Sequence, residues 1–134
     1  MAVRVISGFV SIPSGMGYNA DRNRRQSRMK KTDIYIGLND QDTKVQKFET
    51  EKYVSVLKRL CIAYKVPFSF SLIDGGYIHD SGEYTQEKTL VLTLIDADKN
   101  IIEEIAKDLC VFFHQESVLV TSGEIEAYSI SEHL

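Results

Sequence analysis

Two hydrophobic periodicities alternate along residues 32–134. In residues 32–38, Ile34, Ile36 and Leu38 are separated by polar or small positions, and this alternation predicts a strand. From Thr50, a candidate N-cap, apolar residues then recur at helical spacing as far as Lys65. Pro67 prevents this helix from continuing, because proline lacks the amide hydrogen that a helix interior requires.

The second half of the chain repeats the alternation of strand and helix. The stretches "FSFSLI" (68–73) and "KTLVLTLI" (88–95) each predict a strand. Asp98 or Asn100 is a candidate cap for a second helix, whose apolar face comprises Ile101, Ile102, Ile105, Leu109, Phe112 and Phe113. A final strand is predicted within residues 117–130, with Gly123 as a β-bulge.

The order strand–helix–strand–strand–helix–strand is typical of one fold class. It predicts an α+β, ferredoxin-like βαββαβ sandwich, in which two helices cover one face of a four-stranded antiparallel sheet. We expect one such domain over residues 32–134, because no internal repeat or second domain is visible.

Residues 1–31 differ sharply in charge from the rest of the chain. They hold seven basic groups against one acid, Asp21, whereas residues 32–134 hold nine basic and eighteen acidic groups, a net charge of −9. We interpret them as a basic N-terminal extension. If Arg24 and Arg25 are encoded AGG-AGG, these codons form a bacterial ribosome-binding sequence, and the natural start is Met29. A solvated arm and a nucleic-acid-binding tail are the alternatives.

Composition excludes several classes of function. No apolar run approaches the ~20 residues of a membrane-spanning helix, and the N-terminus is a poor signal peptide. The two cysteines, Cys61 and Cys110, give no disulfide framework, so we expect reduced thiols and a cytoplasmic location. Three histidines without zinc spacing predict no metal site, and we expect no cofactor. The acidic body is not expected to bind nucleic acid directly.

Residues 74–88 carry the densest group of candidate catalytic side chains. Gly75-Gly76 and Ser81-Gly82 are turn residues, which predicts a long, twisted hairpin with a solvated acidic tip. The functional alternative makes Glu87 a general acid or base, with His79 as its partner on the facing strand. Cys110 and His114, four apart on a helix, are a weaker nucleophile pair, because the apolar neighbours of Cys110 predict a buried structural thiol.

Three motifs resemble an uncharacterised bacterial family, domain of unknown function 3574. They are "DIYIGL", "GGYIHDSGEYTQEKTLVLTL" and "FFHQESVLV", and together they extend over nearly all of residues 32–134. The positions that match the family are Tyr35, Gly37, Gly76, Tyr77, Gly82, Glu87, Phe113, Gln115, Glu116, Ser117 and Val118, although Tyr77 stands where the family often has tryptophan. The resemblance implies no chemistry, but it singles out Glu87 and residues 115–117.

These matched residues also have a structural interpretation. A "QES" sequence between a helix and a strand is typical of a turn that caps the helix. In such a turn the Ser117 side chain would form hydrogen bonds with free helix carbonyls or strand amides. Glu87 would accept hydrogen bonds from backbone amides at the base of the hairpin.

The function that we expect from the sequence is a non-catalytic binding or assembly module. The sheet face opposite the helices would be too apolar to stay bare, and it would meet a second subunit in a homodimer, a partner protein, the N-terminal stretch or a ligand. Its expected members are Tyr35, Ser69, Ser71, Ile73, Val91, Thr93, Ile95, Leu119 and Thr121. The candidate binding residues are Tyr35, Tyr77, Glu87, Gln115 and Ser117.

Two alternatives stay open at this point. The acidic body also suits an inhibitor carried by a phage or mobile element, of the anti-CRISPR or anti-restriction type, that blocks the basic groove of a nucleic-acid enzyme. The other alternative is a small enzyme with Glu87 as general base, assisted by His79 or Tyr77. Ferredoxin-like folds support all three functions, so the fold does not decide among them.

Overall fold

The computed structural model of the chain describes residues 28–132, except for the side chain of Tyr77. The expectations for residues 1–27, for His133 and for the Tyr77 side chain lie outside this description. The described elements, in chain order, are β1 (Arg28–Gly37), α3 (Thr50–Ala63), β2 (Ser69–Ile78), β3 (Tyr84–Ile95), α4 (Lys99–Phe112) and β4 (Leu119–Glu126).

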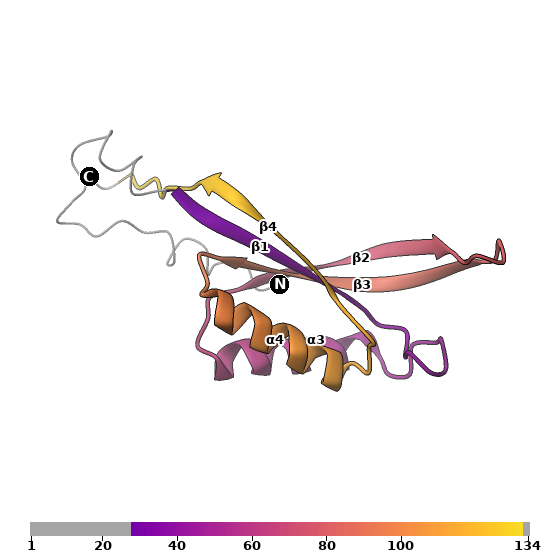
Figure 1. Ribbon diagram of the computed structural model, residues 1–134. Coiled ribbons are helices and arrows are strands. Elements are labelled where there is room, and N and C mark those ends of the chain that lie inside the picture. Colours follow the sequence, from indigo (N-terminus) through magenta and orange to yellow (C-terminus); the bar gives the residue numbers. More distant parts are fainter. Residues whose placement is uncertain (1–27, 133–134) are drawn as a thin grey trace.

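The four strands form one antiparallel sheet in the order β2-β3-β1-β4. Both helices lie on the same side of this sheet (Figure 1). The predicted ferredoxin-like α+β sandwich is therefore confirmed. The β2–β3 hairpin and the β1–β4 pair extend past the helices at opposite ends of the molecule (Figure 1).

The first strand is longer than its alternating pattern predicts. It begins at Arg28, four residues before the expected domain start at residue 32, because Arg28–Lys31 pair with Gly123–Glu126 of β4. Four residues assigned to the basic extension, Arg28, Met29, Lys30 and Lys31, thus belong to the sheet. The predicted bulge at Gly123 is wrong: Gly123 faces Lys31 in a register that continues without interruption on both sides.

The helix boundaries differ slightly from the predicted caps. Glu49 occupies the N-cap position of α3, so Thr50 is the first helical residue and not the cap. Asp98 is the N-cap residue of α4, as expected, although its side chain makes no capping hydrogen bond. Lys65 follows α3 in a left-handed conformation with φ of 58°, which ends the helix before Pro67.

The core lies between the helices and the sheet face that they cover. Most of the apolar positions predicted for both helices and for the central strands meet there, because every second residue of a strand faces the same side. Phe112 was predicted for this face but is 61% exposed, because its neighbour Phe113 turns into the core instead. Its side chains without solvent exposure are Ile34, Ile36, Leu38, Leu57, Cys61, Leu90, Leu92, Leu94, Ile105 and Leu109. Burial raises the pKa of the Cys61 thiol to about 12, so this thiol stays protonated and unreactive.

The register confirms the membership of the open sheet face. Tyr35 faces Val91 on the neighbouring strand, and Leu119 faces Tyr35 from the other side. Val91 and Ile95 are already buried in the described chain, at 9% and 6% exposure. The exposed apolar members of the face are Ile73 and Leu119, on the outer strands, at 42% and 60%. An apolar partner would therefore meet the edges of this face before its centre.

Two expectations about composition can be compared with the described residues. Cys61 and Cys110 are both free thiols, as predicted, but Cys110 is only half-buried. Among the residues that the structure describes, no helix has the length and hydrophobicity needed to cross a membrane.

The core can be tested with two isoleucines that differ in burial. Ile105 in α4 has 0% exposure, and Ile62 in α3 has 67%. We expect Ile105→Ala to lower the free energy of unfolding by about 2–5 kcal/mol, because it leaves a cavity, and Ile62→Ala to lower it by less than about 1 kcal/mol. Urea unfolding of both variants measures the difference, and equal losses would contradict this description of the core.

Candidate functional site

Three segments that are distant in the sequence meet at one corner of the molecule. They are the loop that follows β1, the middle of β3, and the turn between α4 and β4, and they enclose a polar pocket of about 160 Å³. We call it the corner pocket. It is lined by Asn39, Asp40, Gln41, Lys44, Glu87, Gln115, Glu116 and Ser117. Glu87 from one motif and Gln115 and Ser117 from another thus lie in one site.

Glu87 reaches the corner pocket across the end of β1. Its Oε2 accepts a hydrogen bond from the Asn39 amide at 2.9 Å. A Cβ atom on Gly37 would overlap with the Glu87 carboxyl group, so a larger residue there would displace this carboxyl group from its position. Glu87 thus accepts a hydrogen bond from a backbone amide, as predicted, but the donor belongs to the loop after β1 and not to the hairpin. Oε1 accepts no hydrogen bond from a described residue, which leaves one carboxylate oxygen for a ligand.

Asn39 connects all three segments of the corner. Its side-chain amide donates to the Gln86 carbonyl at 3.3 Å, and its own carbonyl accepts from Gln115 Nε2 at 2.5 Å. Together with the bond to Glu87, these contacts fix the loop after β1 against both β3 and the α4–β4 turn. The predicted binding residue Gln115 therefore positions the pocket wall through Asn39.

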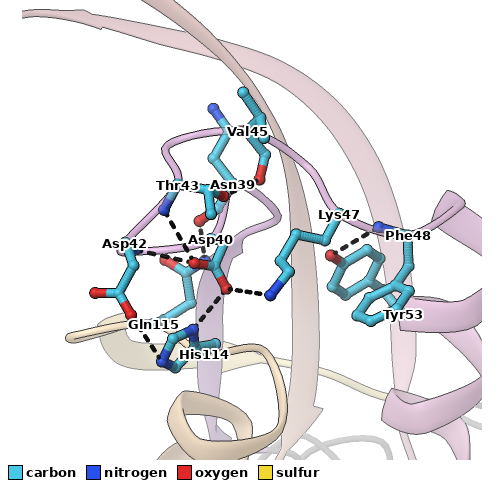
Figure 2. Close-up of polar contacts among 10 residues, drawn as sticks. All are labelled: Asn39, Asp40, Asp42, Thr43, Val45, Lys47, Phe48, Tyr53, His114 and Gln115. Atoms are coloured by element: carbon cyan, nitrogen blue, oxygen red, sulfur yellow. Dashed lines mark hydrogen bonds and ion pairs between the residues drawn. The ribbon is translucent and has the colours of Figure 1, made fainter.

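Asp40 and His114 form the second connection between the loop and the turn (Figure 2). Nδ1 of His114 lies 2.5 Å from Oδ1 of Asp40, whose carboxyl group is only 4% exposed. Oδ2 accepts the amides of Asp42 and Thr43, at 3.0 and 3.1 Å. The His114 hydrogen bond, followed by these amide bonds, lowers the pKa of Asp40 from the ordinary 3.8 to about 2, in spite of desolvation.

The end of α4 places His114 in this contact. His114 has a left-handed φ of 53°, directly after the C-cap residue Phe113, and its carbonyl accepts the Gln41 amide at 3.0 Å. A helix end in this conformation turns the chain sharply, so the imidazole points toward the loop and not along the helix. No motif indicated Asp40, and the helical spacing had grouped His114 with Cys110. The only available signal was the position of His114 at a helix end beside Gln115.

The corner also contains a group of side chains that could hold a metal ion. One ligand atom each from Asp40, Asp42 and His114 lie within 4.8 Å of one another. No sequence spacing indicated this group, because the chain from residue 42 to residue 114 separates its members. Lys47 Nζ also lies 3.9 Å from Asp40 Oδ1. The contacts with His114, Lys47 and two backbone amides are sufficient to stabilise the buried, charged carboxylate of Asp40 without a metal ion.

His79 lies outside the corner pocket. Glu87 pairs with Gly75, and His79 follows four residues later, roughly 13 Å along the strand at ~3.3 Å per residue. At the hairpin tip its Nε2 lies 2.7 Å from Thr85 Oγ1. The predicted pairing of His79 with Glu87 is wrong, because the register of β2 and β3 places the two residues four positions apart along the hairpin.

The remaining predicted residues have distinct positions. Tyr35 is half-buried on the open sheet face, two residues before Gly37, and it does not line the corner pocket. Ser117 lines the pocket, but it makes none of the predicted capping bonds with described residues. Cys110 does not form a nucleophile pair with His114, whose imidazole contacts Asp40 instead.

Comparisons with known proteins give structural but not family relatives. No protein-family model matches the chain, and a search of the curated proteins finds no match. The resemblance to domain of unknown function 3574 therefore stays a prediction.

Several solved structures share the fold. A phage SAM lyase in complex with S-methyl-5'-thioadenosine matches with a TM-score of 0.55 and 23% identity, over 74% of this chain and 90% of the lyase. A phage SAM lyase in its apo state matches with a TM-score of 0.54 and 22% identity, over 76% of this chain and 92% of the lyase. CutA from Synechococcus elongatus matches with a TM-score of 0.50 and 9% identity, over 75% of this chain and 79% of CutA. At these identities the likeness establishes a common fold.

The pKa of Asp40 leads to a testable pH dependence. Because the folded-state pKa is depressed, the Asp40 contribution to stability is present above the ordinary value of 3.8 and is lost as the pH falls toward about 2. We therefore expect Asp40→Asn to destabilise the protein near neutral pH, and its difference from wild type to shrink between about pH 4 and pH 2.

Urea unfolding across this pH range measures the effect. The control is Asp80→Asn, an exposed carboxyl at the hairpin tip, for which we expect no such trend. A difference between wild type and Asp40→Asn that stays constant down to about pH 2 would contradict the proposed role of the His114 hydrogen bond.

Proposed function

We propose that this protein is a small enzyme that binds S-adenosylmethionine and cleaves it to release S-methyl-5'-thioadenosine. The observation that carries the proposal is the convergence of Glu87 with Gln115, Glu116 and Ser117 in the corner pocket. The shared fold with a phage SAM lyase bound to S-methyl-5'-thioadenosine, at 22–23% identity, supports this choice of substrate.

The charges of the corner pocket suit this substrate. S-adenosylmethionine carries a sulfonium and an ammonium cation, and the pocket presents the carboxylates of Glu87 and Glu116. The product S-methyl-5'-thioadenosine has neither cation, so acidic groups favour the substrate over the product. A product that is bound less tightly than the substrate leaves the site readily.

The size of the pocket suggests which part of the substrate it holds. About 160 Å³ is well below the ~300–1,000 Å³ of a pocket that encloses a drug-sized ligand. The amino-acid end of S-adenosylmethionine fits such a volume, whereas the nucleoside requires further surface. The adjoining open sheet face offers Tyr35 and Leu119, which give an aromatic and an apolar surface for the nucleoside.

Release of S-methyl-5'-thioadenosine requires cleavage of the bond between sulfur and the amino-acid chain. The sulfur keeps the electron pair and becomes a neutral thioether. If Glu87 removes a proton from the carbon next to the cleaved one, the second product is an unsaturated amino acid. If the substrate carboxylate displaces the sulfur, the second product is a lactone, and Glu87 acts by binding the cationic end. The identity of this product defines the role of Glu87.

The function is tested with the purified full chain, S-adenosylmethionine and chromatographic detection of S-methyl-5'-thioadenosine. We expect Glu87→Gln to lower its release by about 10²-fold or more, the range for loss of a catalytic acid or base. The same change should lower the free energy of unfolding by only about 1–2 kcal/mol, because the neutral glutamine side chain still accepts the Asn39 amide.

The matched control is Glu83→Gln, at the exposed hairpin tip and away from the corner pocket, for which we expect wild-type activity. No release of S-methyl-5'-thioadenosine by the wild-type protein would refute the proposed function. Full activity of Glu87→Gln would refute the role of this residue.

A second candidate function is assembly through the open sheet face, and the exposure of Ile73 and Leu119 favours it. Two such faces in contact would remove apolar side chains on the outer strands from water. This function is compatible with catalysis, because the corner pocket lies at one end of the same face. The inhibitor of a nucleic-acid enzyme stays a hypothesis that none of these contacts tests.

Self-association is tested by light scattering at micromolar concentration. We expect an oligomer for the wild-type protein and a shift to monomer for Leu119→Glu, because a charge without a partner in an apolar interface costs several kcal/mol. Val111→Glu is the control, since Val111 is 73% exposed on α4, away from the sheet face. A wild-type monomer, or equal effects of both variants, would contradict assembly through this face.

A further inference from the structure

The corner pocket presents charges of both signs to a ligand. Glu87 and Glu116 contribute carboxylates, and Lys44 is the single basic side chain among the described residues that line it. An α-amino acid carries the complementary pair, an ammonium and a carboxylate, within one small group. A pocket with both signs therefore suits the zwitterionic end of a ligand better than a simple cation.

The charge of Lys44 is not compensated by the protein in the part of the chain that the structure describes. The nearby Lys47 lies 3.9 Å from the buried Asp40 carboxylate, which His114 also contacts. Lys44 forms no ion pair with a described residue, although it lines the same pocket as Glu87 and Glu116. Its ammonium group is thus available to an anionic group of a ligand.

The backbone of Lys44 has an energetically unfavourable conformation. Its φ of 63° is left-handed, a conformation that favours glycine. The Asp40 carbonyl accepts the Lys44 amide at 2.8 Å, and the Val45 carbonyl accepts the Asp40 amide at 2.9 Å, so the turn is closed on both sides. Lys65 and Asp96 adopt the same conformation outside the pocket, so the conformation fixes the position of Lys44 and does not by itself identify a ligand.

We propose that Lys44 binds the α-carboxylate of the substrate's amino-acid end, while Glu87 and Glu116 face its cationic groups. This inference rests on the proposed function and deepens it, because it assigns the pocket to the amino-acid end. It makes Lys44 a specificity residue: S-adenosyl compounds with an intact carboxylate bind, and compounds that lack it lose this contact. Lys44 transfers no proton or electron in the cleavage. It acts only by binding the carboxylate and holding the substrate in position.

Two stable ligands separate the amino-acid end from the nucleoside. S-adenosylhomocysteine has the carboxylate and lacks the sulfonium, and S-methyl-5'-thioadenosine lacks the whole amino-acid end. Calorimetric titration of the full chain with both ligands tests the assignment. We expect Lys44→Met to weaken S-adenosylhomocysteine binding at least tenfold, a loss of about 1.4 kcal/mol or more, and to change S-methyl-5'-thioadenosine binding less than twofold. The KM for S-adenosylmethionine should rise to a similar degree.

Lys65 provides a matched control, because it is also a left-handed lysine, with φ of 58°, and does not line the corner pocket. Lys65→Met should leave both affinities unchanged. Lys44→Gly relieves the backbone conformation and removes the charge, so it should unfold at no lower temperature than wild type and still bind S-adenosylhomocysteine weakly. This variant distinguishes loss of binding from loss of folding.

Each outcome decides the inference. If the wild-type protein cleaves S-adenosylmethionine and Lys44→Met binds both ligands as wild type does, Lys44 is not the carboxylate partner and the proposed function stands. If Lys44→Met weakens both ligands equally, its effect is on the pocket as a whole, and the assignment is wrong. If the wild-type protein neither binds these ligands nor cleaves the substrate, the proposed function and the inference both fail.

Discussion

The corner pocket exists because the loop after β1 is bound to the turn after α4. Three bonds make this contact: Asp40 with His114, the Asn39 carbonyl with Gln115, and the Gln41 amide with the His114 carbonyl. The loop has few apolar residues with which to pack, so polar contacts have to hold it in place. Because Asp40 is buried and ionised, loss of its imidazole partner would leave a costly charge, which makes this contact structurally demanding.

The same contact gives Glu87 a defined orientation. The fixed loop presents the Asn39 amide to one carboxylate oxygen, and the missing side chain of Gly37 leaves space for the whole carboxyl group. A group with one oxygen held by the backbone and one free is suitable for both folding and ligand binding. The structural and functional interpretations of Glu87 are therefore compatible, since they concern different oxygen atoms.

The fold itself leaves the function open. CutA and a phage SAM lyase share this arrangement of four strands and two helices with the chain, at low identity. Function in such folds resides in the side chains placed at loop ends, and here those ends meet at the corner pocket. Its mixture of Glu87, Glu116 and Lys44 is the basis of our proposal that it binds a charged amino-acid end.

The architecture of this protein could be predicted from its sequence. The alternation of Leu90, Leu92 and Leu94 specifies a strand, and the helical spacing of Ile102, Ile105 and Leu109 specifies a helix, because periodicity is a local property that burial enforces. Two short motifs also pointed to Glu87 and to residues 115–117.

Which of these residues act together depends on how the segments meet in three dimensions. The structure separates His79 from Glu87 by four positions of a long ladder, and it joins Asp40 to His114 across 74 positions of sequence. Neither result follows from spacing, because strand register and loop placement depend on contacts between distant segments. The left-handed turn at Lys44 was equally hidden, since nothing in a lysine indicates that its surroundings will impose a positive φ, and a histidine such as His114 has only a weak preference for this conformation.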